Sequence, residues 1–152
     1  MANRVQVSLG EGGRRRGSLP SARELRRLLT RAVRVTLAAH QVDGAEVSLT
    51  LLGDAEIAEL NERYLGHEGP TDVISFPLYG PGEPPLGDIY IGVDQALRQA
   101  LECGVPPAEE LARLAVHGTL HVLGYDHPDG PEREKSLMWE RQEAIVREVI
   151  GR

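Results

Sequence analysis

The chain has 152 residues and 41% hydrophobic content, the size and composition of one globular domain, so we expect a single domain over residues 1–152. Its formal net charge of −6 argues against a general nucleic-acid coat protein, since such proteins neutralise phosphates with Lys and Arg. The first residues lack the apolar stretch of a signal peptide, and the longest apolar run, near 47–52, is too short to cross a bilayer. We therefore expect a cytoplasmic protein with no membrane segment. The single Cys103 can form no internal disulfide, and we expect it in the core.

The charge is distributed unevenly along the chain. Residues 1–40 hold nine Arg against two Glu, a net charge of +7, whereas residues 41–152 hold eight basic against 21 acidic residues, a net charge of −13. The basic end can meet an anionic partner. For most of these arginines, however, the more ordinary interpretation is a solvated helix face and a basic loop at 14–16.

The hydrophobic periodicity predicts four strands and five helices. Alternation of apolar and polar residues indicates strands, and apolar residues at three- and four-residue spacing indicate helices. In chain order we expect a strand at 5–9, a helix at 22–40 capped by Ser18 or Ser21, a strand at 47–51, a short helix from 54 to about 64, strands at 72–77 and 88–93, helices at 94–103 and 107–123, and a final helix that follows the PDGPE turn and includes 137–150.

This order of elements predicts the fold class. The Pro- and Gly-rich segment 77–87 is a loop, so the third and fourth strands are expected to be neighbours joined by a long hairpin connection. Asp94 is expected as the N-cap of the helix that follows, and Gly104 as its stop. We expect an α+β single domain, with a mixed four-stranded sheet packed against about five helices and a metal site on a helix in the C-terminal half.

Three of the five histidines lie within eleven residues, in the run HGTLHVLGYDH. His117 and His121 are four residues apart on a mostly apolar helix, so their Cβ atoms lie about 5–6 Å apart and the two rings can converge on one cation. His127 reaches the same ion only if the helix ends, and Gly124 stands where a left-handed residue would end it. A single histidine here would be an ordinary core residue. Jointly, His117, His121 and His127 predict a metal site with one open coordination position, as in catalytic zinc centres.

We expect one Zn²⁺ per chain, although three imidazoles also suit Ni²⁺ or Co²⁺. A structural zinc would need a fourth protein ligand, and the lone cysteine provides no paired thiolates. Asp126 is the nearest candidate, either as a ligand, as an acceptor that orients an imidazole, or simply as a turn residue.

The same histidine spacing occurs in metzincin proteases, where a Glu directly after the first histidine is the general base. Here that position is Gly118, which makes peptide hydrolysis a minor alternative. A zinc-type centre that lowers the pKa of bound water and brings a +2 charge can instead attract and polarise a phosphodiester.

Four segments together closely resemble the YbeY family of bacterial metal-dependent endoribonucleases, over nearly the whole chain. They are LNERY at 60–64, PTDVISFP at 70–77, LGDIYI at 86–91 and the histidine run. The resemblance implies an α+β fold with a mixed sheet, a zinc site formed by His117, His121 and His127, and cleavage of single-stranded RNA. It also implies a role in small-subunit ribosomal RNA 3′-end maturation and ribosome quality control, with ribosomal RNA and the small ribosomal subunit as partners.

One position departs from the family pattern. Family members commonly have an Arg after the NxxY element, where this chain has Leu65, and Arg63 or an Arg of the first helix is a hypothetical replacement. Asp72, Ser75 and Asp88 fall on family motifs, but they are equally ordinary as strand-end and turn residues, so we assign them no catalytic role. Two alternatives remain: a ribosome-associated binding factor with a mainly structural metal, and a general metallohydrolase of peptides or esters.

Overall fold

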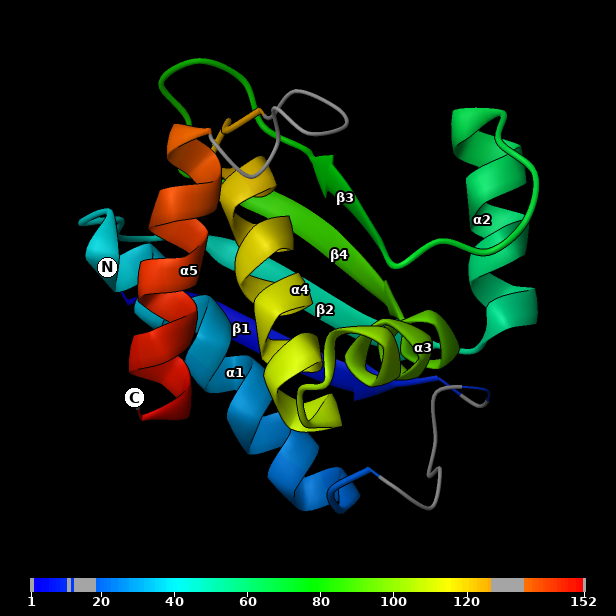
Figure 1. Ribbon diagram of the computed structural model, residues 1–152. Helices are drawn as coiled ribbons and strands as arrows, with labels where there is room; N and C mark the ends of the chain where they lie inside the picture. The colour runs from blue at the N-terminus through cyan, green and yellow to red at the C-terminus, as the bar shows by residue number, and fades with distance from the viewer. Residues whose placement is uncertain (1, 11, 13–18, 127–135, 152) are drawn as a thin grey trace.

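The computed structural model describes residues 2–10, 12, 19–126 and 136–151, and these residues form a four-stranded sheet and five helices (Figure 1). In chain order the elements are β1 (Arg4–Leu9), α1 (Ala22–Ala39), β2 (Glu46–Leu52), α2 (Asp54–Leu65), β3 (Val73–Pro77), β4 (Leu86–Gly92), α3 (Val93–Cys103), α4 (Pro107–Val122) and α5 (Leu137–Ile150). The predicted α+β class and the predicted number of strands and helices are confirmed.

The sheet has the strand order β1-β2-β4-β3. β1, β2 and β4 run parallel, and β3 pairs antiparallel with β4, with Ser75 opposite Ile89. The predicted hairpin connection between the third and fourth strands is thus confirmed. β3 is an edge strand and ends at Pro77, as expected, because a proline cannot donate to a further strand.

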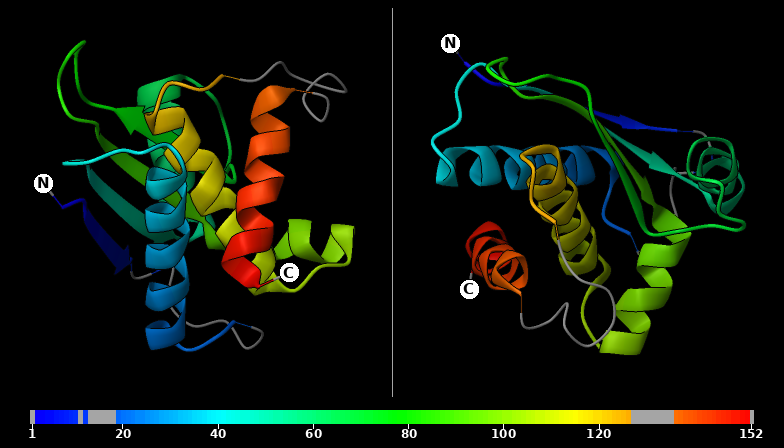
Figure 2. Two further views of the ribbon diagram at one scale, coloured as in Figure 1. Left: turned by 90° about the vertical axis from the view of Figure 1, so that its left-hand side faces the viewer. Right: turned by 90° about the horizontal axis from the view of Figure 1, so that it is seen from above.

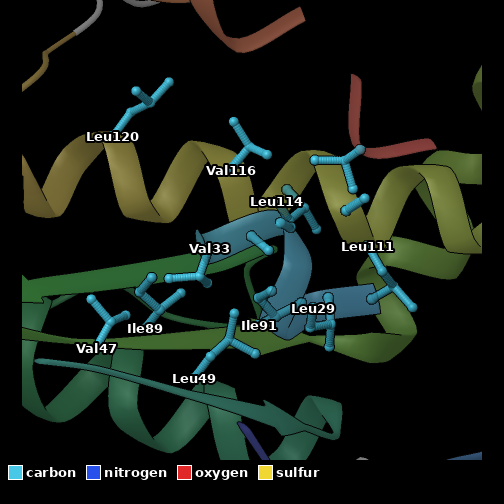
Figure 3. Packing of buried hydrophobic residues seen from close by; sticks show 14 of the residues in the cluster. Leu29, Val33, Val47, Leu49, Ile89, Ile91, Leu111, Leu114, Val116 and Leu120 are labelled. Atoms are coloured by element: carbon cyan, nitrogen blue, oxygen red, sulfur yellow. The ribbon is translucent and has the colours of Figure 1, made fainter. Parts of the chain in front are cut away.

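Helices cover the two faces of the sheet unequally. α1, α4 and α5 lie on one side and α2 on the other, as the view from above shows (Figure 2). The larger core lies between the sheet and α1 and α4, where Leu29 and Val33 of α1 meet Leu49, Ile89 and Ile91 of the strands (Figure 3). A smaller cluster under α2 contains Leu52, Ile57 and Ile74.

α4 is the most enclosed helix of the described chain. It is apolar on most sides, and from Leu111 to Leu120 all but one residue is buried. It contacts α1, α3, α5, β3 and β4. Because α4 is held from several directions, the polar side chains on it have fixed surroundings.

Two local predictions are wrong. Cys103 is exposed rather than in the core. Asp94 is not the N-cap of α3, since the helix begins one residue earlier and Gly92 holds the cap position. The Asp94 carboxylate instead accepts a hydrogen bond from the Asp54 N–H at the start of α2 (2.9 Å).

The caps of the first and last helices are both serines. Ser21 accepts from the Glu24 N–H at the start of α1, whereas Ser18 and the whole PDGPE turn lie outside the described residues. Ser136 caps α5. Among the described helices, each is too short or too polar to cross a bilayer.

Candidate metal centre and its cleft

His117 and His121 lie one turn apart near the end of α4, as predicted. Their Nε2 atoms are 3.1 Å apart, and their ring centroids are 4.6 Å apart with the rings nearly perpendicular. When two nitrogens bind the same Zn²⁺ at about 2.0–2.1 Å and with a tetrahedral N–Zn–N angle, they are roughly 3.3 Å apart. The two imidazoles therefore converge as two ligands of one ion would.

Gln142 of α5 fixes the orientation of the His117 ring. Its Oε1 lies 2.6 Å from His117 Nδ1, and its Nε2 donates to Glu143 Oε2 at 3.1 Å. Because a carboxylate only accepts, that second bond sets which way the amide faces, and the amide oxygen must then accept from His117 Nδ1–H. In a neutral His117 this leaves the lone pair on Nε2, directed at His121.

Gln142 was not found by sequence reasoning, although the sequence carries a signal for it. Its side chain is 2% exposed, and it lies in the apolar stripe of α5, between Met138 and Ile145 at helical spacing. A polar residue inside such a stripe needs a buried partner. Here the partner is a predicted metal ligand.

The helix ends at the predicted glycine. Gly124 has φ +100°, its N–H donates to His121 O at 3.0 Å, and the Tyr125 N–H donates to Leu120 O at 3.0 Å. These two bonds form a Schellman motif, which ends a helix at a left-handed glycine. His127 lies outside the described residues, and within the described residues no group of three possible metal ligands is found. The third ligand thus stays a prediction.

The two histidines line a cleft of about 620 Å³ between the end of α4, the edge strand β3 and the segment after α2, which we call the histidine cleft. Its lining contains Leu65, His67, Asp72, Val73, Ile74, Ser75, Pro77, His117, His121, Gly124, Tyr125 and Asp126. Among these described lining residues the only carboxylates are Asp72 and Asp126, and there is no Lys or Arg.

Gly118 lies where α4 touches the sheet. A Cβ on it would fall 2.7 Å from Ile89 Cγ2 and 3.1 Å from Ser75 Oγ, and Ser75 Oγ donates to the Gly118 carbonyl at 3.2 Å. A longer side chain has no room here. The position that carries the general base in metzincins therefore faces the sheet and cannot hold a Glu in this arrangement.

The two candidate replacements for the family arginine lie elsewhere. Leu65 lines the histidine cleft and is 46% exposed. Arg63 lies in a separate hollow with Tyr90 and pairs with Glu59 at 3.4 Å. On α1, Arg31 donates to the carbonyls that end α5. The structure does not bring any of these arginines into the lining of the histidine cleft.

The three acidic and hydroxyl residues on family motifs have different surroundings. Asp88 accepts from Ser48 Oγ at 2.7 Å and does not line the histidine cleft. Ser75 is bonded to α4, as described above. Asp72 lines the cleft together with His117, and its Oδ1 accepts from its neighbours Val73 N–H and Thr71 Oγ1.

Arg113, one turn before His117, joins α4 to α5 through buried carboxylates. It donates four hydrogen bonds, two to Glu143, one to Glu110 and one to Glu109, at 2.8–3.0 Å. The bonds to Glu143, more than those to the other two carboxylates, raise the pKa of Arg113. Burial alone would raise the pKa of Glu143, but hydrogen bonds from Arg113 and Gln142 outweigh it and lower that pKa. The network thus holds Gln142 through Glu143.

Comparison with known proteins places this arrangement in a family. The family model described as Endoribonuclease YbeY matches residues 15–150. Endoribonuclease YbeY of Moorella thermoacetica is 50% identical over 84% of this chain and 88% of that relative, and its counterpart in Chloroflexus aggregans is 46% identical over 78% and 84%. The solution structure of TM1509 from Thermotoga maritima matches with a TM-score of 0.65 at 31% identity, over 97% of this chain and 89% of that one. The chain belongs to the YbeY family.

Proposed function

We propose that this chain is a metal-dependent endoribonuclease that cleaves single-stranded RNA in the cytoplasm, in the 3′-end maturation of small-subunit ribosomal RNA and in ribosome quality control. The observation that carries the metal-dependent part is the pair of imidazole Nε2 atoms 3.1 Å apart at the wall of an open cleft. The relatives named Endoribonuclease YbeY support RNA as the substrate.

The donor set fits a zinc-type ion. His117 and His121 supply two converging nitrogens, and we propose His127 as the third ligand, after the glycine turn. The Gln142 amide keeps the lone pair of a neutral His117 on Nε2, the atom that would hold such an ion. When bound, such an ion polarises a phosphodiester and lowers the pKa of a water molecule.

The protein residues around the pair have distinct roles in this proposal. Since the described lining of the histidine cleft has no Lys or Arg, a bound ion would supply the attraction for a phosphate. We assign Asp72 as the proton acceptor for the attacking group, because it shares the cleft with His117. Both of its hydrogen bonds among the described residues go to Oδ1, so Oδ2 can take the proton.

The structure argues against a peptidase of the metzincin type. Such an enzyme needs a carboxylate directly after the first histidine. Here that residue is Gly118, and even a Cβ at this position would fall 2.7 Å from Ile89 Cγ2, so a Glu does not fit. The relatives support a nuclease rather than a binding factor with a structural metal, and an experiment separates the two.

The test compares metal-loaded and metal-stripped protein on an unstructured RNA, with casein as a second substrate. We expect the loaded protein to cut the RNA and leave casein intact, and the stripped protein to cut neither. Asp72→Asn should lower the rate of RNA cleavage while it keeps the metal. If removal of the metal lowers the melting temperature but the loaded protein cuts no RNA, the binding factor is the correct assignment.

A further inference from the structure

A second cleft adjoins the histidine cleft. It has a volume of about 440 Å³, and it shares His117 and Asp72 with the histidine cleft. The remaining lining comes from α3, α4, α5 and the connection between α3 and α4: Gln99, Cys103, Val105, Glu110, Arg113, Leu114, Trp139, Gln142 and Glu143. We call it the Trp139 cleft. A group bound in it would lie next to whatever reacts at His117.

The charges of the Trp139 cleft are unsuited to a phosphate. The described lining residues include three carboxylates, Asp72, Glu110 and Glu143, and one guanidinium, that of Arg113. That guanidinium already donates four of the five hydrogen bonds it can make, all to carboxylates. An anion would meet a net negative charge with little donor capacity left to bind it.

The same lining suits a planar, neutral group with N–H donors. Trp139 contributes an aromatic side chain to the lining, and its backbone N–H donates to Ser136 Oγ at 3.1 Å at the start of α5. Arg113, Gln99 and Gln142 already donate to Glu110 and Glu143. A carboxylate has about four acceptor sites and provides no donor, so each of these carboxylates can still accept a hydrogen bond from a ligand. Nucleobases stack on aromatic side chains, and adenine, cytosine and guanine carry an exocyclic amino group whereas uracil does not.

We propose that the Trp139 cleft binds one nucleobase of the RNA strand, next to the scissile phosphate, by stacking on Trp139. The carboxylates favour adenine, cytosine or guanine over uracil at this position, because the exocyclic amino group of these bases can donate to a carboxylate oxygen. Uracil has carbonyl oxygens in place of an amino group, and these would face the carboxylate oxygens as acceptor against acceptor. The inference rests on the proposed function, since it takes RNA as the ligand. It adds a base preference that the histidine pair alone does not produce.

The chain allows a direct test, because it contains one Trp and one Cys and both line this cleft. The full-length, metal-loaded protein is titrated with adenosine, cytidine and uridine 5′-monophosphates, and with ribose 5-phosphate as the probe without a base. None of these contains a phosphodiester bond, so binding is measured whether or not the protein cleaves RNA. Fluorescence reports on Trp139, and the rate of alkylation by iodoacetamide reports on Cys103.

We expect the adenosine and cytidine nucleotides to quench the fluorescence and to slow the alkylation, the uridine nucleotide to do so more weakly, and ribose 5-phosphate to do neither. Trp139→Leu should weaken nucleotide binding about tenfold, which is the loss expected for one base–aromatic stack. In this variant, binding is measured by the protection of Cys103 from alkylation. Trp139→Phe should restore most of the binding. On RNA, Trp139→Leu should raise KM more than it lowers kcat.

Equal effects of ribose 5-phosphate and adenosine 5′-monophosphate would overturn the proposal. Unchanged binding in Trp139→Leu would do the same. The Phe variant guards against a trivial loss of folding, since it keeps the aromatic ring at the same site. Nucleotide binding without any RNA cleavage would refute the proposed function and leave the nucleobase site standing.

Discussion

The first turns of α4 and its last two turns both carry polar side chains inside the protein, but they satisfy them in different ways. In the first part, Arg113 pairs with Glu109 and Glu110 of the same helix and with Glu143 of α5. In the last part, His117 and His121 direct their Nε2 atoms at one another, beside an open cleft. The charges of the first part are paired with one another within the protein, whereas the imidazole nitrogens of the last part face the histidine cleft, where a ligand can bind.

The difference separates support from chemistry on a single helix. A buried ion network that is satisfied internally fixes the position of α5 relative to α4, and Gln142 on α5 then fixes the His117 ring. Changes in the first part should therefore act mainly on stability, and changes in the last part mainly on metal binding and RNA cleavage. Variants in the first part, in the last part and at the contacts that link them separate these effects.

Replacement of the histidines should have the largest effect. His117→Ala and His121→Ala each remove one of the two converging Nε2 atoms, and we expect bound metal to fall from about one ion per chain to background, with loss of RNA cleavage. Metal content by elemental analysis and cleavage of an unstructured RNA are the measurements.

His40→Gln is the matched control for the histidines. His40 is not among the residues that line the histidine cleft; its ring bonds to Thr36 O and to Oη of Tyr125, which does line it. It should keep its metal. Full metal occupancy in the double variant of His117 and His121 would show that the last part of α4 is not a metal site.

Arg113→Met tests the closed network. It leaves Glu109, Glu110 and Glu143 largely buried without their cation, and we expect the free energy of unfolding to fall by about 3 kcal/mol at neutral pH. Urea unfolding measures the loss. Arg98→Met is the control, because the Arg98–Asp54 pair is exposed and should contribute less than about 1 kcal/mol. Equal losses in the two variants would contradict the division.

The network also predicts a pH dependence. The pKa of Glu143 is lowered in the folded protein, so its pairing stabilises the protein above the pKa of the unfolded carboxyl, about 4.3, and that contribution is lost as the pH falls through the lower folded value. The stability difference between the wild type and Arg113→Met should therefore shrink in acid. A difference that grew below about pH 4 would have the wrong sign.

The sequence predicted the elements well, because their signals are local. Alternation marked β1 and β2, and the spacing of His117, His121 and Gly124 lies within one helix and its end. Strand order was not predicted, since pairing brings together segments distant in sequence. Cys103 was placed in the core because a lone cysteine forms no internal disulfide, but it is exposed at the end of α3, where it lines the Trp139 cleft.

The parts of the site that were missed depend on contacts between helices. Arg113 meets Glu143 across 30 residues and His117 meets Gln142 across 25, so neither partner follows from spacing along one helix. Both arise from the way α5 packs on α4. Asp72 was seen in its motif, but only the fold places it in the cleft that His117 lines.

Gln142→Leu tests the link between the two parts of α4. Without the amide oxygen, His117 Nδ1–H loses the acceptor that orients the ring, and we expect zinc affinity to fall roughly 10- to 100-fold. Competition with a chelator measures it. Gln142→Glu keeps an acceptor and should recover much of the affinity, and Gln95→Leu on α3 should leave it unchanged. If the Gln142→Leu and Gln142→Glu variants bind zinc with equal affinity, the Gln142 amide does not orient the His117 ring.

Gly118→Ala should give the smallest effect and needs a double-mutant cycle to interpret. Alanine gains about 1 kcal/mol over glycine in a helix, but here its Cβ would lie 2.7 Å from Ile89 Cγ2, so we expect a net loss of about 1–2 kcal/mol. Ile89→Ala removes that methyl group at the cost of a cavity. In the Ile89→Ala background, Gly118→Ala should then be neutral or stabilising, because the helix preference acts without the collision. Equal losses in both backgrounds would mean that contact with Ile89 does not set how closely α4, with its two histidines, approaches the sheet.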